Sequence, residues 1–376
     1  MLMIERREAL KLALCAGVAL GAPQARAAIR PQKRVVTDHA GREVEVPAVI
    51  RRAVIADVFP LASLATLFLG GAERIAGIHP VSMAAAKSGL LGTLFPGILQ
   101  ADTGFMTGSS LSIESLLRLK PDCVLVNAAN AREISLLETA RIPAVAFSAT
   151  GFGYDVMKTL SAWISLLAAV FPDEGRGKRI LSGVEKAASA ARRRVAARTA
   201  GIPERERGKA LFLFQYGQDR IVVSGRNFFG ESWCRMIGAR NAAESATAKN
   251  ANAAVSIESV YAWNPDVIFI SNFTPAMPSD LYQNRYHKWS GVKAVREKRV
   301  YKMPLGTYRT FTPSADAPVT LLWLAKMTYP KLFADVNLRA EAKAYYEKAF
   351  GKKLRDADVT RLLEPGRVAG LGARIW

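Results

Sequence analysis

Residues 112–126 read Ser-Ile-Glu-Ser-Leu-Leu-Arg-Leu-Lys-Pro-Asp-Cys-Val-Leu-Val, and residues 256–270 read Ser-Ile-Glu-Ser-Val-Tyr-Ala-Trp-Asn-Pro-Asp-Val-Ile-Phe-Ile. The two segments are copies of one unit. In each copy a serine suits a helix N-cap, and the glutamate two residues later lies where the helix dipole favours a negative charge. The short helix ends at Pro-Asp, and the apolar run that follows predicts a buried parallel strand.

The distance between the copies indicates two similar lobes. They start 144 residues apart in a chain of 376 residues, which is too far for a solenoid repeat. Two α/β lobes, which present Glu114 and Glu258 at equivalent places, explain the repetition. A protein with two matched lobes suggests a ligand held in the cleft between them.

The first 27 residues have the pattern of an export signal. Arg6-Arg7 and Leu10-Lys11 precede an apolar stretch over 12–22 and the small-x-small site Ala25-Arg26-Ala27. The Arg-Arg-x-x-Leu-Lys order is similar to a twin-arginine signal, and an ordinary secretory signal that carries two arginines is the alternative. Either signal predicts a periplasmic protein.

The net charge indicates which partners the protein binds, and the cysteines indicate no disulfide. Removal of residues 1–27 takes away four basic and two acidic residues, so the formal net charge of +20 becomes +18. The electrostatic field of this positive charge attracts anions, so we expect the partner to be an anionic small ligand or the membrane surface. Nucleic acid is not expected, because the sequence has no nucleic-acid-binding motif. Cys123 and Cys234 are predicted to be buried single thiols.

The pattern along the chain predicts the order of the lobes. Strands alternate with helices over residues 28–154, which indicates a first α/β lobe with a parallel sheet. The predicted elements include an opening hairpin within 28–52, a helix over 61–69 and strands over 75–78 and 144–147. We interpret His79-Pro80 as a turn. Residues 155–200 carry a helical pattern without strand signals, broken near 172–175, and we interpret its second part as one long connecting helix. Residues 201–376 form a second α/β lobe that ends in closing helices.

At this point the sequence resembles the periplasmic substrate-binding proteins of ABC importers for iron–siderophore, haem and cobalamin, the class with a helical backbone. The resemblance rests on Val36–Arg42 with Val46-Pro47, on the two repeated units, on the long helix near 178–198 and on the ending from Pro318 to Gly351. It implies two Rossmann-like lobes with parallel sheets, bridged by a single long helix, with the ligand in the cleft. It also implies that Glu114 and Glu258 dock into arginine pockets on two permease subunits.

Ligands of open α/β sheets bind beyond the carboxyl ends of the strands, so we collected the residues that follow each predicted strand, together with Phe105 from the Gly/Ser/Thr-rich loop over 102–111. Aromatic rings, amides and arginines there suit a bulky anionic complex. Phe59 and Phe105 could instead belong to the core, and Asn272 could cap a turn. The predicted ligand-binding residues are Phe59, Phe105, Asn127, Tyr154, Tyr216, Asn227, Asn272, Tyr308 and Arg309.

The sequence therefore predicts a monomeric, non-enzymatic binder with no intrinsic cofactor and no metal site of its own. A ferric siderophore is the first cargo, with haem, cobalamin, a nickel chelate or a molybdate-type oxyanion as alternatives. An exported enzyme and a ligand sensor on the same fold are the competing hypotheses. The enzyme hypothesis lacks support, because we find no Gly-x-Ser-x-Gly, Walker or His-Glu-x-x-His motif and no catalytic residues.

Overall fold

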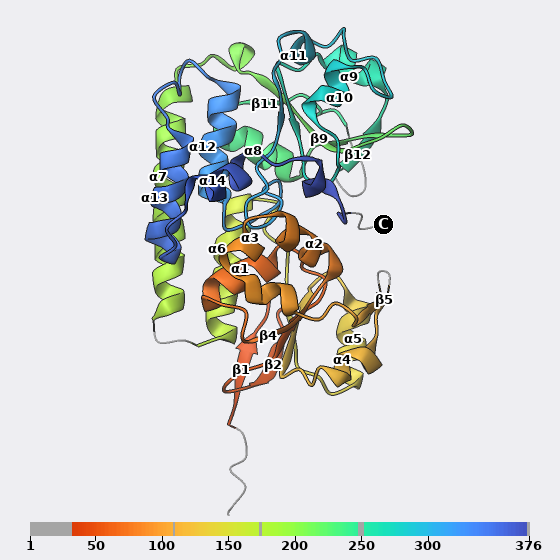
Figure 1. Cartoon of the computed structure of the whole chain (residues 1–376), viewed down its shortest axis with the longest axis vertical. Helices are drawn as coiled ribbons and strands as arrows, with labels where there is room; N and C mark the ends of the chain where they lie inside the picture. Colours follow the sequence, from red (N-terminus) through yellow and green to blue (C-terminus); the bar gives the residue numbers. More distant parts are fainter. Residues whose placement is uncertain (1–31, 108–109, 173–174, 247–251, 374–376) are drawn as a thin grey trace, which may run out of the picture. The chain divides into compact units, whose positions relative to one another are not determined.

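The computed structural model describes residues 32–107, 110–172, 175–246 and 252–373 (Figure 1). The predicted export signal at residues 1–27 lies outside the described residues. The described chain begins with an antiparallel hairpin of β1 (Lys33–Thr37) and β2 (Glu43–Pro47), as the sequence predicts. Asp38 closes this turn, because its carboxylate accepts hydrogen bonds from the backbone N–H groups of Ala40 and Arg42.

The first lobe is built on a four-stranded parallel sheet in the order β4-β3-β7-β8. Its strands are β3 (Ala53–Ile55), β4 (Ile75–Ile78), β7 (Cys123–Asn127) and β8 (Ala144–Phe147). The helices around it are α1 (Leu61–Leu69), α2 (Pro80–Ser88), α3 (Leu91–Leu94), η1 (Pro96–Gln100), α4 (Ile113–Arg118) and α5 (Ala131–Thr139). A small hairpin of β5 (Met106–Thr107) and β6 (Ser110–Leu111) precedes α4.

The second lobe has a six-stranded mixed sheet. β9, β11, β13 and β14 pair in parallel, whereas β10 and β12 are antiparallel additions at one edge. The strands are β9 (Lys209–Tyr216), β10 (Ile221–Ser224), β11 (Arg240–Asn241), β12 (Asn252–Val255), β13 (Val267–Ile270) and β14 (Val300–Lys302). The helices are η2 (Glu204–Glu206), α8 (Phe229–Ile237), α9 (Ile257–Trp263), α10 (Pro278–Tyr282), α11 (Lys293–Arg296), α12 (Ala317–Thr328), α13 (Leu338–Phe350), α14 (Asp356–Leu363) and η3 (Arg367–Gly370).

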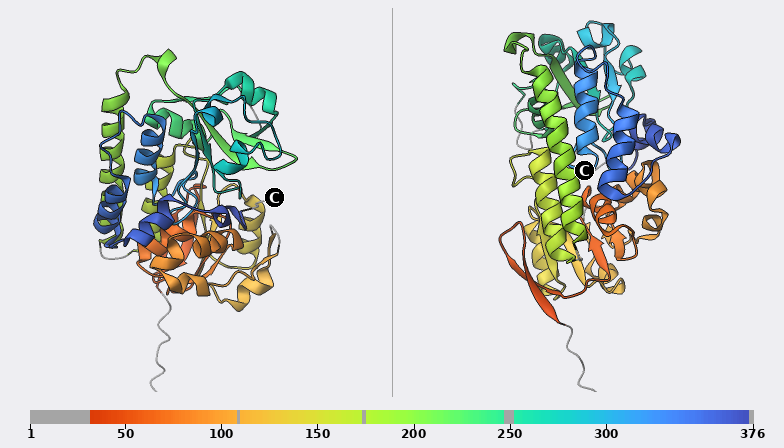
Figure 2. Two further views of the ribbon diagram at one scale, coloured as in Figure 1. Left: turned by 45° about the horizontal axis from the view of Figure 1, so that its top comes forward. Right: turned by 90° about the vertical axis from the view of Figure 1, so that its left-hand side faces the viewer.

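One long helix, α7 (Arg176–Thr199), bridges the lobes, and α6 (Val156–Val170) lies beside it (Figure 2). At 24 residues, α7 is about 36 Å long. Its first residue, Arg176, donates a hydrogen bond to the carbonyl of Phe68 in the first lobe. Near its other end, Arg198 pairs with Asp335 of the second lobe. The sequence prediction of two lobes joined by a long helix is therefore confirmed.

The hydrophobic core runs through both lobes and the connecting helix. The inner faces of the two sheets, with Leu125 and Phe212 as examples, share one cluster with Val184 and Val195 of α7. Each sheet also has an outer cluster, covered by α4 and α5 in the first lobe and by α9 and α11 in the second. Alternate residues of a strand point to opposite faces, which is why Leu211 and Phe212 belong to different clusters.

The free thiols Cys123 and Cys234 are both buried, as predicted. The sequence analysis placed a turn at His79-Pro80, but this segment starts α2, because proline at the first helical position is compatible with helix geometry. Within the described part of the chain, no helix is both long and apolar enough to cross a membrane.

Candidate functional site

One cavity of about 880 Å³ is lined by both lobes at the carboxyl ends of their strands. The first lobe contributes residues 79–81, which follow β4. The second lobe contributes Tyr216 at the end of β9 and Phe273 just beyond β13, and the C-terminal segment adds Arg367 and residues 370–372. This position is where parallel α/β sheets bind ligands, so we take the cavity as the candidate site.

Three arginines outnumber the two acidic side chains, Asp219 and Asp280, on the second-lobe side of the cavity. The side chains of Arg220, Arg285 and Arg367 are 48%, 52% and 47% exposed, so their guanidinium groups remain accessible. Asp280 is buried and accepts two hydrogen bonds from Arg367, at 2.6 and 2.7 Å, and one from Arg285 at 3.3 Å. Burial alone would raise the pKa of Asp280, but these arginines and the Met277 amide outweigh it and hold the pKa below its usual value.

His79 marks the first-lobe wall of the cavity. Its ring Nδ1 accepts a hydrogen bond from the Val81 amide at 3.1 Å, which caps α2. Burial lowers the pKa of His79 to about 4, so the ring is neutral at physiological pH. Phe59 packs against this ring with the centroids 4.5 Å apart. Phe59 therefore packs against a residue of the wall and is not itself among the residues that line the cavity.

Arg309 holds the floor of the site together. It is fully buried and donates hydrogen bonds to the backbone carbonyls of Asn272 at 2.9 Å, Val81 at 3.0 Å and Leu371 at 3.2 Å. These three acceptors belong to the second lobe, the first lobe and the C-terminal segment. The sequence analysis proposed Arg309 as a ligand contact, but the structure places its guanidinium among backbone carbonyls, where it ties the lobes together.

Lys302 fixes the loop that carries Phe273. Its buried ammonium group donates to the carbonyls of Ser271, Thr274 and Ala276 at 2.8, 2.6 and 3.0 Å. Burial, with a contribution from the Arg309 charge, lowers the pKa of Lys302 to about 7. The loop after β13 is thus held by a buried amino group that does not line the cavity.

The predicted residues differ in where the structure places them. Tyr216 alone lines the cavity, and its hydroxyl donates to the Arg285 carbonyl. Asn272 and Tyr308 are buried under the cavity, because the Asn272 amide binds the carbonyls of Met303 and Pro304 and the Tyr308 ring packs on Arg309. Phe105 is fully buried in the outer core of the first lobe, which makes it a packing residue.

The remaining predicted residues lie beside the cavity and not on its wall. The Tyr154 ring packs against Phe228, 5.0 Å between centroids, and so joins the first-lobe loop after β8 to the second lobe. Asn227 precedes Phe228, is exposed, and donates its backbone N–H to Glu231. The Asn127 backbone N–H donates to Asp57 at 2.6 Å.

Two carboxyl groups give the first lobe a different character. Asp57 follows β3 and accepts hydrogen bonds from the Asn127 amide and the Asn130 side chain. Glu133, in the first turn of α5, is 4% exposed. Burial, and then the Asp57 charge, raise the pKa of Glu133 to about 7. Its Oε2 atom is buried and has no hydrogen-bond partner among the described residues.

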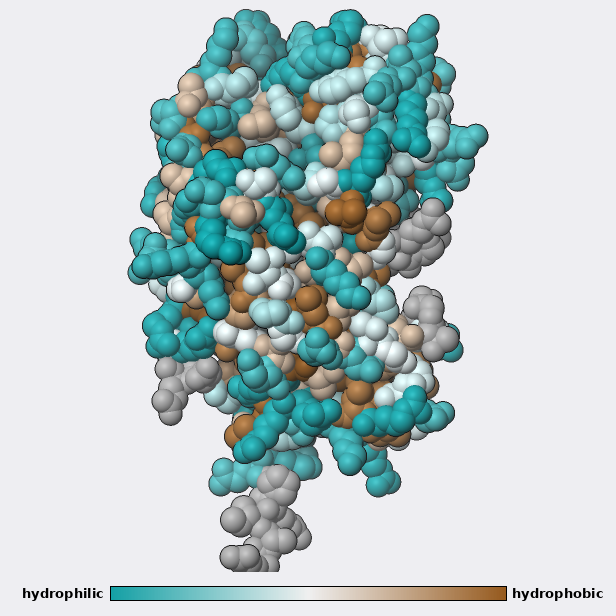
Figure 3. Space-filling model, in the orientation of Figure 1, coloured by the Kyte–Doolittle hydropathy of each residue, from teal (hydrophilic) through white to brown (hydrophobic). Residues whose placement is uncertain are grey.

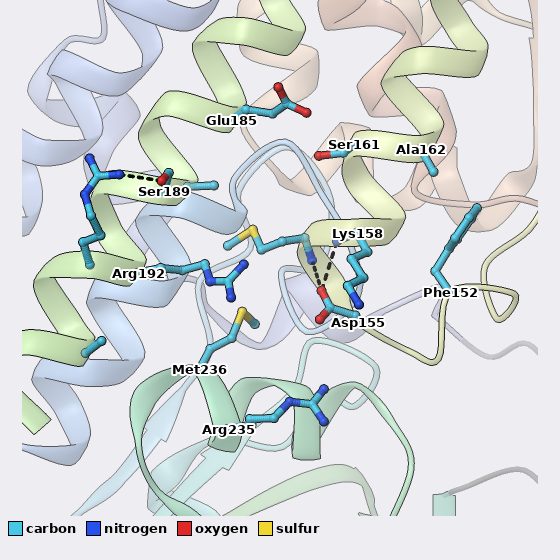
Figure 4. Close-up of a pocket in the computed structure, with 14 residues that line it drawn as sticks. Phe152, Asp155, Lys158, Ser161, Ala162, Glu185, Ser189, Arg192, Arg235 and Met236 are labelled. Atoms are coloured by element: carbon cyan, nitrogen blue, oxygen red, sulfur yellow. Dashed lines mark hydrogen bonds between the residues drawn. The ribbon is translucent and has the colours of Figure 1, made fainter. Parts of the chain in front are cut away.

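A second hollow, of about 910 Å³, lies between α6, α7 and α8 (Figure 4). Lys158, Arg192 and Arg235 face it, but so do Asp155 and Glu185. Figure 4 shows the Asp155 carboxylate between Lys158 and Arg192, where it also caps α6. Acidic and basic side chains line both cavities, and the interlobe cavity is the stronger candidate because it lies at the carboxyl ends of the strands of both lobes.

The two repeated glutamates are exposed in the first turns of α4 and α9. Ser112 caps α4 by accepting from the Ser115 amide at 3.3 Å, and Ser256 caps α9 by accepting from the Ser259 amide at 3.4 Å. In Figure 1 both helices lie on the right-hand side, one in each lobe. The repeat therefore presents one accessible carboxylate from each lobe.

Sequence reasoning did not select several residues that line the cavity. Arg220 follows the β9 end and could have been found by extending the rule about strand ends. Asp280 and Arg367 could not have been found in this way, since they are 87 residues apart and neither belongs to a local motif. Among the described residues, no group of three or more His, Cys, Asp or Glu side chains could hold a metal ion.

The comparisons with known proteins agree with this architecture. The family model for periplasmic binding proteins matches residues 59–305, and the chain belongs to that family. The molybdate-binding protein MolA of Haemophilus influenzae is 28% identical over 353 residues, covering 87% of this chain and 94% of MolA. The protein is thus a solute-binding protein of an ABC transporter, a class whose place is the periplasm.

Two solved structures are similar along nearly their whole length. A periplasmic solute-binding protein from Veillonella parvula has a TM-score of 0.76 at 26% identity, over 88% of this chain and 97% of its own. MolA bound to molybdate has a TM-score of 0.70 at 26% identity, over 86% and 99%. These relatives are binding proteins and not enzymes, which supports a non-enzymatic role.

Proposed function

We propose that this protein captures an anionic metal complex in the interlobe cavity and delivers it to an ABC importer. The observation that carries the proposal is the set of half-exposed guanidinium groups of Arg220, Arg285 and Arg367 on one wall of the cavity. Guanidinium groups pair with carboxylates and other oxyanions through several N–H donors in one plane. A strongly basic chain also steers anions toward the cavity.

A ferric siderophore is the first candidate cargo. The cavity volume of about 880 Å³ falls in the range of roughly 300–1,000 Å³ that is typical of sites for organic ligands. Tyr216 and the half-exposed Tyr286 add aromatic surface for an organic chelator. A molybdate-type oxyanion is the second candidate, supported by the similarity to MolA. A nickel chelate, haem and cobalamin complete the set to be tested.

Delivery would use Glu114 and Glu258. Both carboxylates are exposed, and each is presented by a serine-capped helix of its own lobe. A charge-assisted contact between arginine and carboxylate is directional, yet at an exposed interface it remains reversible. We propose that the protein acts as a monomer, with one glutamate docking on each permease subunit.

The binding experiment begins with native mass spectrometry of protein isolated from the periplasm, where retained cargo shows its mass. Titration calorimetry with ferric catecholate and hydroxamate siderophores, nickel–histidine, haem, cobalamin and sodium molybdate follows. We expect one class to bind, to be recovered chemically unchanged, and to bind about 10- to 100-fold more weakly to Arg285→Gln. Arg192→Gln, in the hollow beside α7, is the matched control. The absence of binding by the whole panel would refute the proposal.

The docking experiment uses uptake of the identified cargo in cells that carry the neighbouring permease and ATPase genes. Glu114→Arg combined with Glu258→Arg should abolish uptake while leaving the Kd for cargo unchanged. Glu138→Arg, on exposed surface of the first lobe, is the control for charge reversal. Normal uptake by the double variant would rule out the docking role.

A further inference from the structure

The C-terminal segment, residues 364–373, runs from the end of α14 in the second lobe to α2 in the first lobe. Gly370 packs so closely on the second lobe that a Cβ atom there would lie 2.1 Å from the Thr274 carbonyl oxygen. Gly372 has a φ of +63°, and a Cβ atom there would lie 2.6 Å from the Ala84 Cβ of α2. The segment therefore contacts both lobes, and glycine is required at each contact.

The same segment forms part of the cavity wall. Arg367 and residues 370–372 line the cavity, and the Leu371 carbonyl accepts from Arg309, which also binds the Val81 carbonyl of the first lobe. Val368 and Leu371 are 58% and 55% exposed. Figure 3 shows an apolar patch where this segment reaches the surface near the end of the described chain. The segment is thus well anchored on its inner side and accessible on its outer side.

Arg367 is oriented by Asp280 and not by its own segment. Two of its terminal nitrogens donate to the two Asp280 oxygens, at 2.6 and 2.7 Å. The Asp280 side chain is 3% exposed and that of Arg367 is 47% exposed. A guanidinium group has five N–H donors, so this pairing uses two and leaves others directed away from Asp280. The arrangement fixes a cation at the cavity wall without neutralising its accessible side.

We propose that residues 364–373 form a strap that joins the lobes at the cavity, and that the strap brings Arg367 into contact with an anionic group of the cargo. Asp280 acts as the positioning residue for Arg367. The cargo contact rests on the proposed function, because it takes the interlobe cavity as the cargo site. The strap itself does not, since it is defined by contacts within the chain.

The strap is tested without ligand by measuring distances between the lobes. Nitroxide labels at Leu136→Cys and Lys288→Cys report one position in each lobe, and the buried thiols Cys123 and Cys234 will not react under native conditions. We expect Gly370→Ala and Gly372→Ala to broaden the distance distribution measured by pulsed electron spin resonance. Gly366→Ala is the matched control, because a Cβ atom there meets nothing within 4 Å. Distributions that stay unchanged in both variants would overturn the strap.

The cargo contact is tested by calorimetry with the same siderophore, chelate and molybdate panel. Arg367→Gln should weaken binding of the cargo about 10- to 100-fold, and Asp280→Asn should weaken it less, because the guanidinium group remains but is no longer held. Arg205→Gln is the control, since Arg205 is exposed and pairs with Glu206, outside the strap and the cavity. Unchanged affinity of Arg367→Gln overturns the contact. If the wild-type protein binds no probe, the proposed function and the contact both fail, whereas the strap is judged by the distances alone.

Discussion

The two copies of the repeated unit have the same local structure but different electrostatic neighbours. Each begins with a serine cap and exposes a glutamate in the first helical turn. In the first copy Glu114 pairs with Arg118 at 2.8 Å, one turn further on. In the second copy Ala262 takes that place, and a hydrogen bond from Ser256 is the main cause that lowers the pKa of Glu258. The repeat thus places both carboxylates equally but leaves Glu258 less neutralised.

The strands that end the two copies lead to surroundings of opposite charge. In the first lobe, β7 ends beside Asp57, which lies close to the buried Glu133. In the second lobe, β13 leads to a loop held by Lys302 and Arg309. A shared framework therefore does not determine the chemistry of the cleft, because the residues that decide it lie outside the repeat.

The largest effect on stability is expected in the second lobe. Arg309→Leu would leave three buried backbone carbonyls, from both lobes and the strap, without their donor. We expect the free energy of unfolding to fall by about 3–5 kcal/mol, because an unsatisfied buried acceptor loses its full solvation. Urea denaturation followed by circular dichroism measures this, with exposed Arg220→Leu as the control. A loss below about 1 kcal/mol would contradict the tie between the lobes.

Lys302→Met should have the next largest effect. It removes the donor for the carbonyls of Ser271, Thr274 and Ala276 while keeping a flexible side chain of similar length. We expect a loss of about 2–4 kcal/mol and weaker cargo binding, because the loop with Phe273 is no longer held. Lys288→Met, at an exposed position of the same lobe, should change neither quantity. Equal stability of the two variants would show that the loop does not depend on Lys302.

In the first lobe, the buried carboxyl group of Glu133 should make the free energy of unfolding depend on pH. The pKa of Glu133 in the folded protein is about 7, above its ordinary value of 4.5, so the folded state holds this proton more tightly. Stability is therefore lost as pH rises from about 4.5 to about 7. Glu133→Gln removes that loss and should stabilise the protein by about 1–2 kcal/mol at pH 8 but not at pH 4.

Thermal unfolding of the wild-type protein and of Glu133→Gln across this pH range measures the effect, with Glu138→Gln on the same helix as the control. Glu138 is exposed and should show no such pH-dependent gain. If Glu133→Gln were equally stabilising at pH 4 and pH 8, the buried carboxyl group would not be the cause.

The smallest effect on stability is expected at the repeat itself. Arg118→Ala releases Glu114 from its exposed ion pair, which should cost less than about 0.5 kcal/mol. Under the docking proposal it should make the first copy electrostatically equal to the second and strengthen binding to the permease several-fold. Surface plasmon resonance on permease in nanodiscs measures this. Weaker docking would mean that the Glu114–Arg118 pair acts as a unit.

Several elements could be predicted from sequence because they rest on local chemistry. The helix Leu61–Leu69 and the strands Ile75–Ile78, Ala144–Phe147 and Val267–Ile270 have the bounds that their apolar patterns predict. The start of α2 was missed, because His79-Pro80 resembles a turn as much as a helix start. The antiparallel strand β12 was also missed, since an edge strand of four residues carries little pattern of its own.

The candidate site shows more clearly which features the sequence does not predict. The rule about strand ends found Tyr216 on the cavity wall, but it also selected Arg309 and Tyr308, which are buried. A residue type and its place after a strand do not show whether the side chain turns toward the cleft or into the core. That depends on the loop conformation, which is set by contacts with distant residues.

The amino-acid pattern alone determined that this protein has two α/β lobes, a long connecting helix and two matched acidic helices, because helix caps, apolar periodicity and repetition act over a few residues. Only the tertiary structure decided which arginines face the cavity and which side chain holds them. Asp280 and Arg367 meet because the chain returns across both lobes after 87 residues. Such a contact depends on the packing of the whole chain, and no local preference in the sequence encodes it.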